Sequence, residues 1–250
     1  MKKLRVGTRG SKLATTQTKQ TLAVFQEHFP EVEVELVKIK TKGDHLATHN
    51  LQAIGGQGCF VRELEYQLRE GEIDFAIHSL KDIPTTIHEE LALACIMKRH
   101  SPTDALIIRE AGKTLETLPK NAVVGTSSLR RKAHLLHVRP DFDIQPIRGN
   151  IDTRIRKMNE GQYDAIVLAL AGLERLGLDQ TVYHQELSPE IMLPAIGQGA
   201  IALECRKDNT EILQMLKKME HLETAIAVTA ERAFLNSMDG SCTFPVGAYC

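Results

Sequence analysis

Two short patterns occur twice in the chain, in the same order. The first is an apolar run ending in Gly-Thr, followed by a polar turn and a helical pattern; it occurs at 6–8 and again at 123–126. The second is a glycine, then an aspartate three residues later and an apolar run; it starts at Gly71 and again at Gly161. Short apolar runs between turn signals are typical of buried strands. The repeated order therefore predicts two α/β domains of related topology, although shared local propensities would also produce it.

We expect the chain to cross between these domains twice. The segment 98–104 breaks the apolar pattern after a strand expected at 91–96, and 189–199 contains two prolines and two glycines. Two crossings between two lobes create a hinged cleft, as in solute-binding proteins. The predicted units are domain 1 at 1–98 and 198–217, domain 2 at 103–193, and a partial domain 3 at 220–250.

The end of the sequence predicts one more strand, at 243–249. An isolated strand pair is marginal in water, and no sequence remains to supply further partners. We therefore expect this strand to be unpaired, to dock on an existing sheet edge, or to belong to a third unit that is truncated here.

Residues 78–84 (HSLKDIP) follow an apolar run at 73–77. Pro84 disfavours helix at the residue before it, so we expect the strand to continue into a fixed, extended loop. Ligands of open α/β sheets bind at the carboxyl ends of strands. Asp82 is the candidate catalytic residue, because a carboxylate beside a lysine and partly removed from water can transfer protons or stabilise a cation. The alternative is a salt-bridged surface loop.

Residues 125–132 (GTSSLRRK) predict an anion site, because a helix N-terminus with unpaired backbone N–H groups follows two hydroxyls and adjoins two arginines. From Arg130 to Arg175 there are nine Lys/Arg and six Asp/Glu, a local balance of +3 in a chain of net charge −1. Arg148 and Arg154 bound one loop, from which they can converge on a multi-anionic ligand. The alternative is a solvated basic face.

Composition restricts the remaining possibilities. A net charge of −1 and the absence of tryptophan argue against a nucleic-acid binder. No apolar run approaches the ~20 residues that span a bilayer, and no secretion signal is present, which indicates a cytoplasmic protein. The five cysteines show no Cys-x-x-Cys spacing, so neither a metal site nor a disulfide framework is expected. Cys242 is a candidate nucleophile if positive charge lies nearby, and otherwise an inert loop thiol.

These motifs, together with 193–199 (LPAIGQG), 204–206 (ECR) and 229–232 (TAER), resemble the porphobilinogen deaminase (hydroxymethylbilane synthase) family from residue 8 to the end. The resemblance implies a transferase of haem and porphyrin biosynthesis that deaminates four porphobilinogen units and condenses them head-to-tail into hydroxymethylbilane. It implies two periplasmic-binding-protein-like (type II) domains and a C-terminal cofactor-carrying α/β domain, truncated here. It also implies a dipyrromethane cofactor, joined to Cys242 by a thioether.

The resemblance assigns roles to individual residues. Asp82 matches the catalytic acid, which protonates the departing amine, and the arginines match groups that bind the acetate and propionate of each pyrrole. The implied cofactor-binding residues are Cys242, Ser79, Lys81, Thr126, Ser127, Ser128, Arg130 and Arg131. The implied substrate-binding residues are Arg9, Ser11, Arg148, Gly149, Asn150, Arg154, Arg175 and Gln198. The stretch before Phe60 matches an active-site lid, with Gln57 and Cys59 where the family usually has Lys and Leu.

The alternative function is a non-catalytic, two-lobed binder of small polycarboxylates on the same scaffold. For the enzyme we expect a monomer whose partner is the small molecule porphobilinogen, with no nucleic acid and no membrane.

Overall fold

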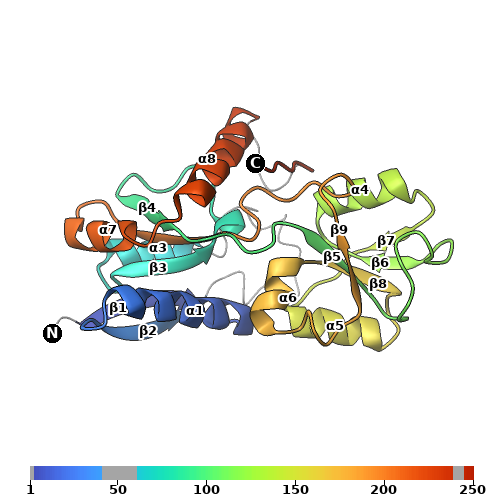
Figure 1. Ribbon diagram of the computed structural model, residues 1–250, viewed down its shortest axis with the longest axis horizontal. Coiled ribbons are helices and arrows are strands. Elements are labelled where there is room, and N and C mark those ends of the chain that lie inside the picture. The colour runs from blue at the N-terminus through green and yellow to red at the C-terminus, as the bar shows by residue number, and fades with distance from the viewer. Residues whose placement is uncertain (1–2, 41–60, 239–244) are drawn as a thin grey trace.

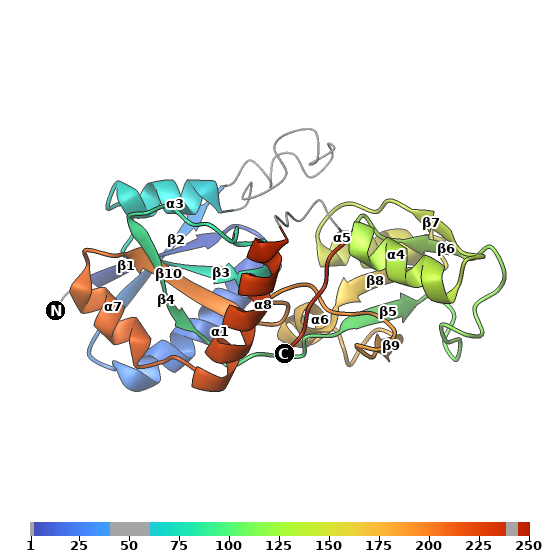
Figure 2. The ribbon, with the colours of Figure 1, turned by 90° about the horizontal axis from the view of Figure 1, so that it is seen from above.

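The computed structural model describes residues 3–40, 61–238 and 245–250. Two α/β lobes lie side by side (Figures 1 and 2), and each is built on a sheet with five strands among the described residues. The strand order is β2-β1-β3-β10-β4 in the first lobe and β7-β6-β8-β5-β9 in the second. None of the helices in these ranges is long and apolar enough to cross a membrane.

Among the described residues, the first lobe contains 3–40, 61–96 and 201–238. Its strands are β1 (Lys3–Arg9), β2 (Glu33–Ile39), β3 (Phe75–Ser79), β4 (Leu91–Ile96) and β10 (Ile201–Arg206). Its helices are α1 (Lys12–His28), α3 (Arg62–Arg69), α7 (Thr210–Lys217) and α8 (Leu222–Ser237), with a 3-10 turn η2 (Leu80–Asp82) after β3. Phe25 of α1 packs on Phe75 of β3, with ring centroids 5.7 Å apart. The predicted cap of α1 is confirmed, because the Ser11 hydroxyl accepts from the Ala14 N–H.

The second lobe contains residues 104–187. Its strands are β5 (Asp104–Ile108), β6 (Val123–Gly125), β7 (Asp143–Gln145), β8 (Ala165–Ala169) and β9 (His184–Leu187). Its helices are α4 (Leu129–Val138), α5 (Ile151–Asn159) and α6 (Leu170–Leu176). Strands β5 and β8 are buried along almost their whole length, as expected for a sheet that is covered on both faces.

The repeated patterns correspond to equivalent pieces of the two sheets. Gly7 pairs with Ala76 between parallel strands, and Gly125 pairs with Ile166 in the same way. In the first lobe, the carboxylate of Asp74 accepts from the backbone N–H of Arg5 at 2.7 Å. In the second, Asp164 accepts from the N–H of Val123 at 2.9 Å. The predicted relation between the two topologies is therefore confirmed.

Each sheet also contains one antiparallel strand at a crossing. β5 is the first strand after the chain leaves the first lobe, and β10 is the first after it returns. The crossings are the connections 97–103 and 188–200. They lie next to one another, since the His100 N–H donates to the Gly199 carbonyl at 3.2 Å. The domain boundaries given above stay a prediction.

Two local expectations are wrong. Leu80–Asp82 forms a 3-10 turn rather than an extended loop, and extended backbone begins only at Ile83, the residue that Pro84 constrains. Residues 245–250 form no strand: within the described part of the chain they make one backbone–backbone bond, from Ala248 N–H to Pro194 O, and the Cys250 N–H donates to the Glu231 side chain. A strand needs a ladder of such bonds. The predicted lid and Cys242 lie outside the described residues.

Candidate active site

A cleft of about 1170 Å³ separates the two lobes. The first lobe contributes the start of α1 and the end of β3, while the second contributes the loop 146–154, the end of β8 and part of α6. Figures 1 and 2 show α1 and α6 meeting at one side of the space between the lobes. This volume exceeds that of most small-molecule sites, about 300–1000 Å³, so the cleft has room for a ligand of several rings.

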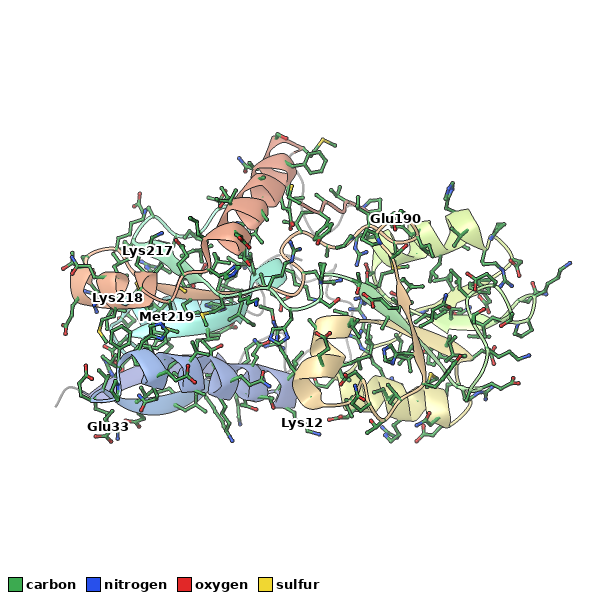
Figure 3. The ribbon with its side chains drawn as sticks, viewed as in Figure 1. Lys12, Glu33, Glu190, Lys217, Lys218 and Met219 are labelled. Atoms are coloured by element: carbon green, nitrogen blue, oxygen red, sulfur yellow. The ribbon has the colours of Figure 1, made fainter. Side chains whose placement is uncertain are left out.

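The wall of this cleft is strongly basic. Its described basic residues are Arg9, Lys12, Lys40, Lys81, Arg131, Arg148, Arg154, Lys157 and Arg175. Asp152 is the one acidic residue among the described lining residues, and it pairs with Lys12 across the lobes at 3.6 Å. Lys12 lies at the start of α1, beside α6 (Figure 3). The excess of cations suits a ligand with several carboxylates or phosphates.

Two of these arginines have no carboxylate partner among the described residues: Arg175 is buried and Arg154 is half-buried. Burial, together with the charges of Arg131 and Arg148, lowers the pKa of Arg154 to about 10. Burial also lowers the pKa of Arg175 to about 10, although Glu174 opposes the shift. Each guanidinium donates to one backbone carbonyl, at 2.7 and 2.6 Å respectively. Because an anion would offset this burial, both groups are suited to ligand binding.

The loop before α4 uses its hydroxyls internally. Ser128 caps α4 by accepting from the Arg131 N–H, Thr126 accepts from the Ser128 N–H at 3.1 Å, and Ser127 donates to the Ile147 carbonyl at 2.8 Å. These hydroxyl residues are not part of the cleft wall as described. They hold the loop that positions Arg131, and their direct contact with a cofactor stays a prediction.

Arg130 and Arg131 already have an anion, the carboxylate of Asp104. This residue begins β5 and is fully buried; it accepts from Arg130 at 2.7 Å and from Arg131 at 2.6 Å. Burial alone would raise the pKa of Asp104, but the charges and hydrogen bonds of Arg131 and Arg130 outweigh it and lower the pKa to about 2. Arg131 still reaches the cleft wall, whereas Arg130 turns to the Leu193 carbonyl and is not among the lining residues described.

Sequence reasoning missed Asp104. The available signal was an aspartate at the start of a strand of otherwise apolar residues, immediately after a crossing. Aspartate is almost never fully buried unless it is paired, so this position pointed to an unseen cation.

Gln198 connects the buried ion pairs of Asp104 with Arg130 and Arg131 to the first lobe. Its side-chain N–H₂ donates to Pro102 O at 2.7 Å and to Asp104 at 3.1 Å, while its oxygen accepts from Lys81 at 3.3 Å. It is fully buried and is not among the lining residues described. A continuous chain of polar contacts therefore runs from Lys81 through both crossings to Arg131. Contact of Gln198 with substrate stays a prediction.

Lys81 and Asp82 lie side by side on η2, at the end of β3. Lys81 lines the cleft and is open to solvent there. The surrounding walls still lower the pKa of Lys81 to about 8, first by partly removing its amine from water and then through the charge of Arg131, against the opposing charges of Asp82 and Asp104. Asp82 is half-buried, adjoins the wall without being part of it, and forms no hydrogen bond or ion pair with any described residue. Among the described residues, therefore, none competes with a ligand for its carboxylate.

The other predicted residues also lie near the cleft. Arg9, Ser11, Ser79, Arg148, Gly149 and Asn150 are all part of its wall. Ser79 donates to Gln17 at 3.2 Å. Gly149 has φ of +114°, and a Cβ there would lie 2.8 Å from the Thr153 side chain, so this turn requires glycine. Cys242 is outside the described residues.

Comparison with known proteins identifies the relatives of this chain. The family model "Porphobilinogen deaminase, dipyromethane cofactor binding domain" matches residues 4–214, and "Porphobilinogen deaminase, C-terminal domain" matches 225–250. A porphobilinogen deaminase of Shouchella clausii is 50% identical over 249 residues, which cover all of this chain and 80% of the relative. That of Streptococcus sanguinis is 51% identical and is covered to 82%.

Solved structures support the fold alone. A substrate-binding domain of a putative amino acid ABC transporter from Streptococcus pneumoniae is similar with a TM-score of 0.53 at 12% identity, covering 95% of each chain. An ancestral cationic amino acid solute-binding protein is similar with a TM-score of 0.50 at 13% identity, covering 95% of this chain and 93% of the other. The periplasmic-binding-protein-like fold expected for the two lobes is confirmed.

Proposed function

The chain belongs to the porphobilinogen deaminase family, and on that premise we propose that the basic cleft between its lobes is the site of the family's reaction. The protein is a transferase of tetrapyrrole biosynthesis that condenses four porphobilinogen units into hydroxymethylbilane and uses a dipyrromethane cofactor. The observation that carries the assignment to the cleft is its wall, where nine basic residues face a single acidic one among the described lining residues.

The cleft residues fit the dipyrromethane chemically. Each of its two pyrrole rings bears two carboxylates, and Arg131, Arg148, Arg154 and Lys81 are cations of the wall that would hold them. When bound through Cys242, this group supplies the pyrrole carbon to which the first incoming unit is joined. Arg154 is half-buried and has no carboxylate partner among the described residues, which supports this fit.

Asp82 would act as the acid of the deamination. Its carboxyl group gives a proton to the departing amine, and as a carboxylate it then stabilises the positive charge that develops on the pyrrole nitrogen. Lys81 lies next to it, and the charge of Asp82 opposes the lowering of the pKa of that lysine by burial and by Arg131. The pair can therefore hold a proton close to the reacting amine while Lys81 binds a substrate carboxylate.

The remaining arginines would accommodate chain growth. Each added ring brings two carboxylates, so the ligand becomes more anionic at every addition, and Arg9, Arg148 and Arg175 lie in the wall to receive them. We further infer that the product serves haem synthesis, that the cofactor bond is a thioether, and that the enzyme is a cytoplasmic monomer without a nucleic-acid or membrane partner.

The covalent cofactor can be tested by intact mass. Expressed in cells supplied with porphobilinogen, the wild-type protein is expected to carry one dipyrromethane adduct, because a thioether survives denaturation. Cys242→Ser should show only the polypeptide mass. Cys250→Ser, which removes an exposed thiol in the same part of the chain, is the control and should keep the adduct. A bare wild-type mass would contradict the proposal and favour a polycarboxylate binder.

Anion affinity is expected to depend on the charge of Lys81. A bound carboxylate stabilises the protonated amine, so affinity should be constant below pH 8 and fall above it, by at most about tenfold per pH unit. The measurement is calorimetric titration with citrate from pH 7 to 9, a range in which citrate keeps its full charge. Lys81→Arg should bind citrate with little pH dependence there; equal pH slopes for both proteins would contradict the assignment.

A further inference from the structure

One arginine outside the cleft contacts the loop that follows Asp82. Arg232, on α8, donates to the carbonyls of Ile83 at 3.2 Å, Pro84 at 2.6 Å and Thr85 at 3.1 Å. These are three consecutive residues, so a single planar guanidinium determines the path of the backbone directly after the acid. On the other side, the Ile83 N–H donates to the Leu80 carbonyl and closes the turn that contains Asp82. Asp82 is therefore held between this turn and the three hydrogen bonds from Arg232, which we call the Arg232 clamp.

The helix that carries this clamp is itself firmly anchored. Glu231, the neighbouring residue, is buried and accepts from Arg99 at 2.5 Å and from the Gly197 N–H at 2.8 Å. Arg99 belongs to the outgoing crossing and Gly197 to the return crossing. Figure 2 shows α8 on the side of the first lobe that faces the second. Consecutive residues of α8 thus bind both crossings and the Asp82 loop.

We propose that Arg232 is a positioning residue for Asp82. By binding the carbonyls of Ile83–Thr85, it holds the Asp82 carboxylate at the edge of the cleft and couples the position of this acid to α8. This inference rests on the proposed function. The sequence continues from α8 to Cys242 within five residues of the helix end at Ser237. The clamp therefore links the acid to the element that precedes the cofactor attachment residue. A misplacement of about 1 Å in a catalytic group can cost on the order of a hundredfold in rate.

The second lobe provides a matched control. Arg139 also clamps a loop through its carbonyls, with donations to Leu115 at 2.5 Å and to Leu118 at 3.0 Å. Its loop contributes no residue to the cleft wall as described. Arg139→Gln therefore removes the same kind of contact without touching the acid loop.

The test compares Arg232→Gln, Arg232→Lys and Arg139→Gln, each checked for adduct mass and thermal unfolding. We expect Arg232→Gln to lower kcat about thirtyfold with KM changed less than threefold, since the arginine contacts no substrate. We also expect amide hydrogen exchange of residues 81–83 to become at least about tenfold faster. Arg232→Lys keeps the charge but cannot span three carbonyls, so it should recover only part of both effects. Arg139→Gln should change neither kcat nor exchange at 81–83.

The proposal is overturned if Arg232→Gln, or Arg232→Lys where the glutamine variant does not fold, matches Arg139→Gln in kcat and in exchange at residues 81–83. It is also overturned if kcat falls while exchange at 81–83 stays at the wild-type rate, since the loop is then not what the arginine controls. The exchange measurement needs no turnover, so failure of the proposed function, seen as an inactive wild-type protein, is distinguished from failure of the clamp.

Discussion

Replacing Asp82 with asparagine is expected to remove turnover of porphobilinogen while leaving the protein folded. The amide has nearly the same shape but cannot donate a proton to an amine or stabilise a cation as a carboxylate does. Loss of a general acid typically costs about 10²- to 10⁴-fold in rate. The carboxylate is half-buried and makes no hydrogen bond or ion pair with a described residue, so little stability should be lost. Steady-state kcat and the thermal unfolding midpoint measure the two parts of this expectation.

A surface aspartate gives the control for this experiment. Asp208 pairs with Arg206 at 2.8 Å, far from the cleft wall, and Asp208→Asn should leave kcat unchanged. Asp82→Glu retains an acid of altered reach and should be intermediate. Wild-type rates in Asp82→Asn would eliminate the assigned role, and the acid would then have to be sought among other groups of the cleft.

The two-lobed fold was predictable because its signals are local. Gly71 adopts φ of +70° and Gly161 +85°, conformations that favour glycine, and the aspartates that follow them bind the backbone of the neighbouring strand, β1 or β6. A glycine that a turn needs and the buried apolar strand after it both lie within about ten residues of sequence. The repeated pattern could therefore be recognised without any knowledge of tertiary contacts. The same holds for the cap of α1 at Ser11.

The partners of the site residues were less accessible. Arg130 and Arg131 were expected to receive an external anion, yet both bind Asp104, which lies 26 and 27 positions away and reaches them only through the packing of β5 against β8. No periodicity encodes such a contact. Likewise, the end of the chain has strand-like composition, but composition cannot indicate whether a partner edge is available. Among the described residues, 245–250 make one backbone–backbone bond, to Pro194, and one bond to the side chain of Glu231.

The second large effect is expected for Asp104→Asn, which should lower the free energy of unfolding rather than act directly on the reaction. Asp104→Asn leaves two guanidinium groups buried against a neutral amide, and breaking a buried ion pair on one side costs about 3–5 kcal/mol. For a chain of this size, this corresponds to a decrease of roughly 10 °C in the unfolding midpoint. Because Arg131 also lines the cleft, the surviving folded protein should bind polycarboxylates more weakly. Differential scanning calorimetry and citrate titration measure these changes.

A second ion pair in the same lobe serves as a control that separates the contribution of burial to this loss of stability. Arg139 and Asp141 form a partly exposed ion pair with the same chemistry at 2.7 Å, so Asp141→Asn should lower the midpoint much less than Asp104→Asn does. The pH dependence gives an independent check. The pKa of Asp104 is lowered from its usual 3.8 to about 2, so its contribution is fully present above pH 4 and is lost as the pH falls through about 2. Wild-type stability should therefore fall more steeply than that of Asp104→Asn between pH 4 and pH 2. Two results would mean that the carboxylate of Asp104 does not hold the two arginines in place. One is that the stability of the wild type and of Asp104→Asn falls equally between pH 4 and pH 2; the other is that Asp104→Asn and Asp141→Asn have equal unfolding midpoints at neutral pH.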